Sequence, residues 1–162
     1  MAAVDYFLKI NGIPGESQDS KHKGEIQLES WSWGATNKGT FASGTGGGGA
    51  GKVAMQDFSI IKQIDKSSPK LFLACASGQH IPDALFTARK AGKDQQEYLK
   101  IKFTDLLVSS YQTGGTADQV TPTETFSLNF SKIEVQYAPQ KSDGTLDAPI
   151  VHNYDVKANK GG

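Results

Sequence analysis

The sequence predicts a mainly β fold in which two antiparallel sheets wrap into a barrel, with one short flanking helix at about 68–77 and a long glycine-rich loop at about 38–52. Apolar and polar residues alternate with a period of two along most of the chain, which is typical of half-buried strands. The alternation changes phase inside several segments, which indicates long strands that bend. A single segment lacks this alternation and has the start and stop residues of a helix.

The alternation places apolar side chains on one face of each predicted strand. The residues expected to share a face are Val4, Tyr6, Leu8 and Ile10; Leu99, Ile101 and Phe103; Phe126, Leu128 and Phe130; and Ile150, His152, Tyr154 and Val156. Two more strands are expected around 60–64 and 84–88. These segments together predict an all-β architecture with one exception.

Three segments switch the phase of their alternation partway along. The switches separate 26–28 from 31–33, 99–103 from 106–108, and 126–130 from 133–137. A switch inside one strand implies either a bulge or a strand that passes from one sheet to the other. The two longest strands, at about 97–111 and 123–138, flank a polar turn at Gly114 and Gly115, and therefore predict a long hairpin.

The predicted helix begins near Ser68, which can cap its first turn, and Pro69 suits the first helical position. Gly78 suits the position just after its end. A helix of about ten residues is marginal alone, so it must pack on the barrel. We expect this packing from Leu71, Phe72, Ala74 and Cys75, with Cys75, the chain's lone cysteine, as a buried and inert thiol rather than a nucleophile.

The length of 162 residues fits a single domain over 1–162, with a polar tail from about 157 that is expected to fray. Lysine and arginine together number 17, as do aspartate and glutamate. This balance argues against nucleic acid or a membrane surface as the main partner. The first ten residues lack the pattern of a signal peptide, and no run is long enough to insert in a membrane. We therefore expect synthesis in the cytoplasm, with any export performed by another machine.

The glycine-rich loop matches part of a phosphate-binding motif, because Gly46 and the following glycines lead to Gly51 and Lys52. That motif needs serine or threonine next to hold magnesium, and this chain has Val53. It also needs a strand before the loop and a helix after it. We expect loop before it and strand after it, which excludes a phosphate site and predicts no cofactor.

The same loop is long for a compact domain, and such loops are usually functional or disordered. Phe41 is an apolar group within it that lacks an evident partner. The hypothesis is that the loop becomes ordered against a neighbouring subunit. The candidate contact residues are Gly39, Thr40, Phe41, Gly46, Gly47, Gly48, Gly49, Gly51 and Lys52.

Catalytic and metal-binding patterns are otherwise missing from the sequence. His22, His80 and His152 are scattered without metal-ligand spacing, and His152 is expected to be a hydrogen-bonded structural histidine. No nucleophile elbow is present. We therefore predict neither catalytic nor metal residues, and a protein that is not an enzyme.

Several short stretches, in order from about residue 5 to 145, resemble the haemolysin-coregulated protein (Hcp) family, the tube subunits of bacterial type VI secretion systems. The stretches are Gly15-Glu16-Ser17, Trp31-Ser32-Trp33-Gly34, Gly48-Gly49-Ala50-Gly51-Lys52-Val53, Ile64-Asp65-Lys66-Ser67-Ser68-Pro69, Arg89-Lys90-Ala91-Gly92, Leu107-Val108-Ser109-Ser110, Leu128-Asn129-Phe130 and Pro139-Gln140-Lys141.

The resemblance implies an assembly that composition does not show. Homo-hexameric rings would stack into a tube behind a spike protein, inside a contractile sheath, with effector proteins in the channel. Export by this system to the extracellular space or a target cell would need no signal peptide. By the same resemblance, Ser32 would face the channel as an effector contact, and the 38–52 loop would reach the next ring or a neighbouring subunit.

Alternation supports a core role for Trp31 and Trp33, with Ser32 on the opposite face. Two alternatives to a tube subunit remain at this stage. One is a ring that acts mainly as an effector chaperone with little tube formation. The other is an enzyme that uses the glycine loop, which particle imaging and sizing would separate from a ring.

Overall fold

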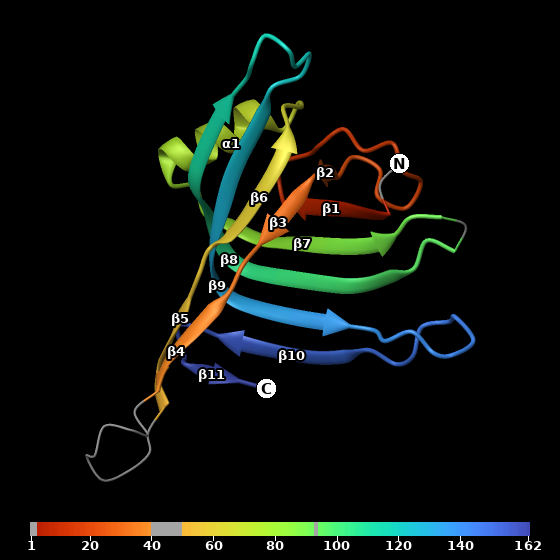
Figure 1. Ribbon diagram of the computed structural model, residues 1–162. Coiled ribbons are helices and arrows are strands. Elements are labelled where there is room, and N and C mark those ends of the chain that lie inside the picture. Colours follow the sequence, from red (N-terminus) through yellow and green to blue (C-terminus); the bar gives the residue numbers. More distant parts are fainter. Residues whose placement is uncertain (1–2, 40–49, 93) are drawn as a thin grey trace.

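The computed structural model describes residues 3–39, 50–92 and 94–162, and strands make up most of this part of the chain (Figure 1). The elements in chain order are β1 (Val4–Ile10), β2 (Ile26–Leu28), β3 (Ser30–Ser32), β4 (Ala35–Gly39), β5 (Ala50–Met55), β6 (Phe58–Gln63), α1 (Ser68–Ser77), β7 (Ile81–Lys90), β8 (Glu97–Gly114), β9 (Thr123–Tyr137), β10 (Ile150–Asp155) and β11 (Lys160–Gly161). All strand pairings between these elements are antiparallel. The predicted mainly β class with one short helix is confirmed.

The β8–β9 hairpin is the central element of the fold, and it belongs to two layers. The start of β8 pairs with β7, while the end of β9 pairs with β10. At the other end of the hairpin, the start of β9 pairs with β6. The first layer therefore contains β10, the end of β9, the start of β8, β7, β1 and β2. The second layer contains β3, β6, the start of β9 and the end of β8, and Figure 1 shows the hairpin curving from one layer into the other.

The predicted phase switch in this hairpin coincides with its passage between layers. The register stays constant from Leu99 opposite Tyr137 to Val108 opposite Leu128. The buried side nevertheless changes from Phe103 to Leu106 across Asp105, which has a φ of 51°. The switch therefore reflects a strand that bends between sheets. A separate register shift lies between Val108 and Ser110.

The switch between β2 and β3 has a comparable origin at Glu29. The strand β2 pairs with β1, whereas β3 pairs with β6. Between them, the Glu29 N–H donates to the Ile61 carbonyl at 2.9 Å. Through this residue the pairings lead back from β6 to β1, so the two layers wrap around one core.

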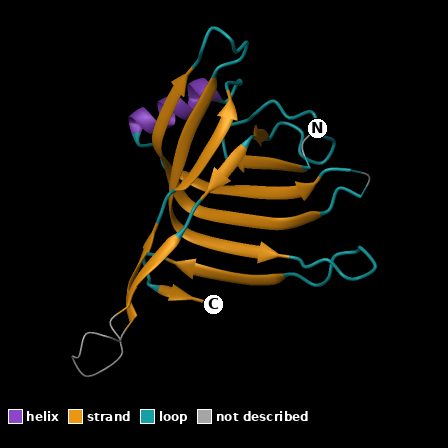
Figure 2. Cartoon of the chain, in the orientation of Figure 1, coloured by secondary structure: helices purple, strands orange, loops and turns teal. Residues whose placement is uncertain are grey.

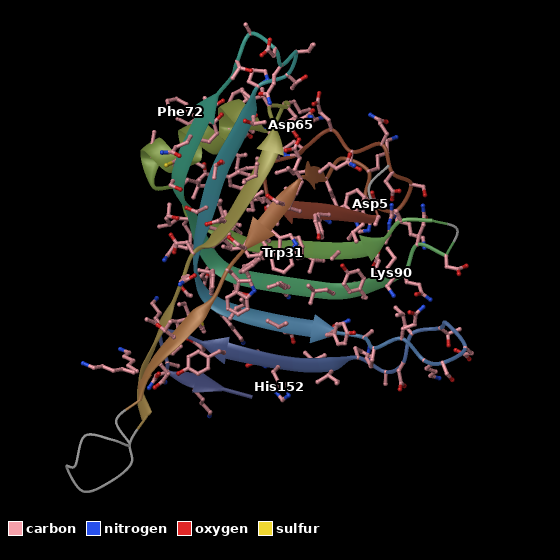
Figure 3. The ribbon with its side chains drawn as sticks, viewed as in Figure 1. Asp5, Trp31, Asp65, Phe72, Lys90 and His152 are labelled. Atoms are coloured by element: carbon pink, nitrogen blue, oxygen red, sulfur yellow. The ribbon has the colours of Figure 1, made fainter. Side chains whose placement is uncertain are left out.

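Aromatic side chains fill that core and join the two layers. Phe58 of β6 lies 5.4 Å from Phe86 of β7 and 4.8 Å from Phe103 of β8 between ring centroids. Trp31 of β3 lies 4.9 Å from Phe86 and stacks on Phe58 at 5.8 Å. Burying side chains of this size stabilises a fold by roughly 1.5–3 kcal/mol each. Figure 3 shows Trp31 on the side of β3 that faces the first layer.

The helix α1 lies at the predicted position, but its first turn is built differently. The N-cap residue is Ser67, without a side-chain capping bond, and Ser68 instead donates its hydroxyl to the Glu124 carboxylate at 3.0 Å. Gly78 ends the helix with a φ of 63°, as predicted. Leu71 and Ala74 pack inward as expected.

Two other expectations about α1 are met only in part. Phe72 is 57% exposed, and it makes an edge contact with Tyr111, which packs against the core. Cys75 packs against the core as expected, but this free thiol is half-buried rather than fully buried. Both differ because the helix rests on the end of β8 with one narrow face.

The C-terminal strands differ most from expectation. The expected apolar face of the last strand is only partly covered. Tyr154 packs against the core as expected, but the first half of β10 lies beyond the core. Ile150 and His152 are consequently exposed, and the structural role expected for His152 is wrong (Figure 3). The tail was expected to fray, yet Lys160 pairs with Asp155 as part of β11.

Candidate functional site: a hydroxyl-lined sheet face

Four serines form a row across the outer face of the second layer. Ser32 of β3 lies opposite Ser59 of β6, and Ser59 lies opposite Ser127 of β9. Ser127 in turn lies opposite Ser110 of β8. The serine row, defined as Ser32, Ser59, Ser127 and Ser110, therefore runs across four adjacent strands.

The row points away from the core because its neighbours along each strand point into it. Trp31, Phe58 and Phe126 fill the core from β3, β6 and β9, and alternation sends the next residue to the other side. Ser32 is exposed, as the sequence predicted, and Trp31 packs against the core from the opposite face. Trp33 also packs partly against the core, which confirms its expected role.

A chain of hydrogen bonds extends the row toward Asp57. The hydroxyl oxygens of Ser110 and Ser127 are 2.6 Å apart, and those of Ser127 and Ser109 are 2.7 Å apart. Ser109 donates to Asp57 Oδ2 at 2.6 Å, and Asn129 Nδ2 donates to Asp57 Oδ1 at 2.9 Å. We call Asp57, Ser109, Ser127 and Ser110 the hydroxyl relay.

The surroundings of the row are polar but carry little charge. The next rung outward contains Ser30, Ile61, Thr125 and Gln112. Ile61 is the one large apolar residue of this rung and is 41% exposed. No lysine or arginine occupies an outward position on the four strands of this layer, all of which lie within the described residues. The face therefore offers hydroxyls and amides without a positive charge of its own.

The strands β4 and β5, which flank the glycine-rich segment in the sequence, form a two-stranded sheet that extends away from the barrel (Figure 2). The predicted loop bounds are wrong, because β4 and β5 include residues 38–39 and 50–52. Gly39 is exposed at the end of β4, opposite Ala50. Gly51 and Lys52 lie in β5, with Lys52 exposed. The remaining candidates, Thr40, Phe41, Gly46, Gly47, Gly48 and Gly49, lie outside the described residues.

The strands on either side of the glycines also show whether the partial phosphate-binding motif could bind a phosphate. A strand precedes the glycines, contrary to expectation, since β4 ends at Gly39. The element after the glycines is β5 and not a helix, as expected, so no helix N-terminus is available there for a phosphate. Across residues 3–39, 50–92 and 94–162, no group of His, Cys, Asp and Glu side chains is arranged to hold a metal. The one described helix is too short to cross a membrane.

His22 has a structural setting that the sequence did not reveal. It is buried, stacks on Phe7 with 4.3 Å between centroids, and contacts Glu25 and Glu97 at 2.8 and 2.6 Å through its two ring nitrogens. His80 contacts Asp105 at the exposed surface at 3.0 Å. His22 and His80 therefore have separate carboxylate partners and form no shared site.

Sequence reasoning found Ser32 of the serine row but missed the other three serines of the row and the hydroxyl relay. The available signal was the outward phase of Ser59 and Ser127, each between two apolar core residues. Nothing local linked the serines of the relay to Asp57, because Ser109 and Asp57 are 52 residues apart in the chain.

The comparisons with known proteins agree with this architecture. Residues 7–137 match the family described as type VI secretion system effector, Hcp. The chain belongs to the Hcp family. This Hcp-family chain is 48% identical over 159 residues to protein hcp1 of Pseudomonas aeruginosa, covering 97% of the chain and 98% of the relative.

Solved structures extend the similarity of this Hcp-family chain to its fold. The crystal structure of Hcp1 from Salmonella typhimurium matches with a TM-score of 0.83 and 41% identity, covering 99% of this chain and 100% of that one. A structure described as a type six secretion system protein matches with a TM-score of 0.93 and 33% identity, over 99% and 100% of the two chains. The resemblance seen in the sequence is thus confirmed across nearly the whole chain.

Proposed function

We propose that this chain is a non-enzymatic subunit of the type VI secretion tube, forming homo-hexameric rings that stack and carry effector proteins in their channel. The observation that supports this most is the hydroxyl-lined outer face of the second layer in a chain of the Hcp family. In this proposal the face lines the channel. The spike protein and contractile sheath are the other partners, and the protein is made in the bacterial cytoplasm and exported by this system.

The chemistry of the face suits the wall of a channel through which proteins pass. Its hydroxyls can form hydrogen bonds with varied protein surfaces, while strong charge would hold some cargoes tightly and repel others. Ser32 lies at the β3 end of the serine row and is exposed. We therefore propose Ser32 as an effector contact.

The β4–β5 hairpin supports a role in contacts between subunits. A two-stranded hairpin is at best marginally stable in water without a further layer or strand. Among the described residues, β4 and β5 pair with each other and with no other strand. We propose that the hairpin and its glycine-rich tip, which contains Phe41, pack on an adjacent ring or subunit.

A Ser32→Gln substitution is expected to reduce effector retention by roughly tenfold without preventing ring formation. The longer side chain fills space at the channel wall and replaces a hydroxyl contact, an effect of about 1.4 kcal/mol. Co-purification of effector with rings, checked by electron microscopy, measures both properties. Lys102→Met on the first layer is the control. Unchanged retention in intact Ser32→Gln rings would exclude Ser32 as a cargo contact.

Replacing residues 40–49 with an Asn-Gly turn is expected to leave rings intact and to abolish their stacking. Asn-Gly favours a tight two-residue hairpin turn, so β4 and β5 can still pair. Electron microscopy and sizing of the purified protein distinguish single rings, tubes and monomers. Tubes of normal length would disprove the stacking role, and monomers would assign the segment to contacts within the ring.

A further inference from the structure

The hydroxyl relay has a fixed direction, which is set by the chemistry of its last member. An ionised carboxylate can only accept hydrogen bonds, so the proton between Ser109 and Asp57 Oδ2, 2.6 Å apart, belongs to Ser109. A serine hydroxyl has a single proton. Ser109 must therefore accept from Ser127, and Ser127 must accept from Ser110. All three protons point along the relay toward Asp57.

This direction determines what the relay offers to a molecule beside it. Ser110 donates its single hydroxyl proton in the hydrogen bond to Ser127, so its exposed oxygen can only accept further hydrogen bonds. Ser109 is exposed as well, and its remaining capacity is also that of an acceptor. Asp57 adds a partly exposed carboxylate, whose negative charge polarises the whole chain. The surface is thus acceptor-rich and negative.

We propose that Asp57, Ser109 and Ser110 form a binding site for a lysine or arginine side chain of a cargo protein. This inference rests on the proposed function, in which the face lines the channel. Lysine and arginine have donors and no acceptors, so they match the direction of the relay. A carboxylate of the cargo would meet acceptors and a like charge.

Two neighbouring features fit the same occupant. Where the four strands form the second layer, no outward position carries a lysine or arginine. Lys157, after β10, lines a hollow with Leu107 and Asn129 and is the cation that a cargo side chain would have to displace or avoid. Leu107 lies opposite Asn129, next to Asp57, and is 37% exposed. The methylene stem of a lysine or arginine can pack on such an apolar group while its charged end reaches the acceptors.

The test uses the assembled protein and two dye-labelled peptides, triarginine and triglutamate, at low ionic strength. We expect triarginine to bind and to shift the methyl NMR signals of Leu107, whereas triglutamate does neither. Asp57→Asn should weaken triarginine binding by roughly tenfold, because a charge-assisted contact is lost and the direction of the relay is no longer fixed. Ser110→Ala, which leaves the Asp57 contacts in place, should weaken binding by roughly threefold.

Asp147→Asn is the matched control, since it removes one exposed carboxylate from the loop before β10. It should change the affinity by less than about twofold. Wild-type affinity in Asp57→Asn, an equal loss in Asp147→Asn, or binding that leaves Leu107 unshifted would overturn the proposal. Thermal unfolding of each variant verifies that it is folded.

Electron microscopy of the same samples separates this site from the proposed function. Rings whose triarginine affinity does not depend on Asp57 would contradict the site alone. A protein that binds triarginine through Asp57 but forms no rings would contradict the tube function and leave a cation site without that role. Reduced ring formation in Asp57→Asn would assign the relay to a subunit contact and overturn the cargo proposal.

Discussion

A Glu124→Leu variant is expected to lose about 3–5 kcal/mol of unfolding free energy, because it removes the buried counterion of a buried ammonium group and leaves only the partly exposed Asp65. Glu124 is 1% exposed, and Lys62, with which it forms an ion pair, is 0% exposed. In a domain of this size the loss corresponds to a decrease of roughly 6–20 °C in the unfolding midpoint. Differential scanning calorimetry measures it.

The size of this effect reflects how many groups depend on the pair. Glu124 also accepts hydrogen bonds from Ser68 at 3.0 Å and from Tyr111 at 2.6 Å. Lys62 contacts Asp65 at 2.8 Å and donates to the Gln63 carbonyl at 3.1 Å. Burial, followed by the bond to Glu124, raises the pKa of Tyr111 to about 12, so the phenol remains a donor. The network therefore links the start of α1 to β6, β8 and β9.

A double variant, Lys62→Met with Glu124→Leu, is the informative companion. Replacing both members of a buried pair with apolar groups of similar size is often neutral. We expect it to recover most of the stability lost in Glu124→Leu. Lys102→Met removes an exposed charge and should change stability by less than about 0.5 kcal/mol. If Glu124→Leu costs no more than this control, the pair does not stabilise the fold.

A Phe58→Ala variant is expected to lose about 3–5 kcal/mol, the usual cost of deleting a buried aromatic ring. Phe58 is completely buried and touches Trp31, Phe86 and Phe103. These neighbours belong to both layers, so the resulting cavity would lie where the layers join. Trp31, which precedes Ser32 in β3, would lose its stacking partner.

Phe58→Leu is the control for this substitution, because it keeps most of the apolar volume. We expect it to cost about 1–1.5 kcal/mol, measured by urea unfolding with an unchanged dependence on urea concentration. Phe58→Ala should also weaken ring formation at temperatures near its lowered midpoint. A Phe58→Ala variant as stable as Phe58→Leu would mean that the core collapses around the missing ring.

The sequence by itself determined the local features of this protein. Period-two alternation gave the strands, and its phase switches identified where the two long strands change layers, at Asp105 in β8 and between Phe130 and Ile133 in β9. Gly78 marked the end of α1. The position of Ser32 between Trp31 and Trp33 placed its side chain outside. These features arise from backbone geometry and from the burial of apolar groups, which act over a few residues.

Only the tertiary structure decided which distant groups meet. Lys62 and Glu124 lie in phase with core residues of their strands, but the pairing of β6 with β9 is what makes them partners. Ser109 and Asp57 meet because β9 pairs with both β8 and β6, and the exposure of His152 results from the position of β10 near the edge of the first layer. Hydrogen bonds and ion pairs depend on distances of a few ångströms between strands, and sequence spacing does not determine those distances.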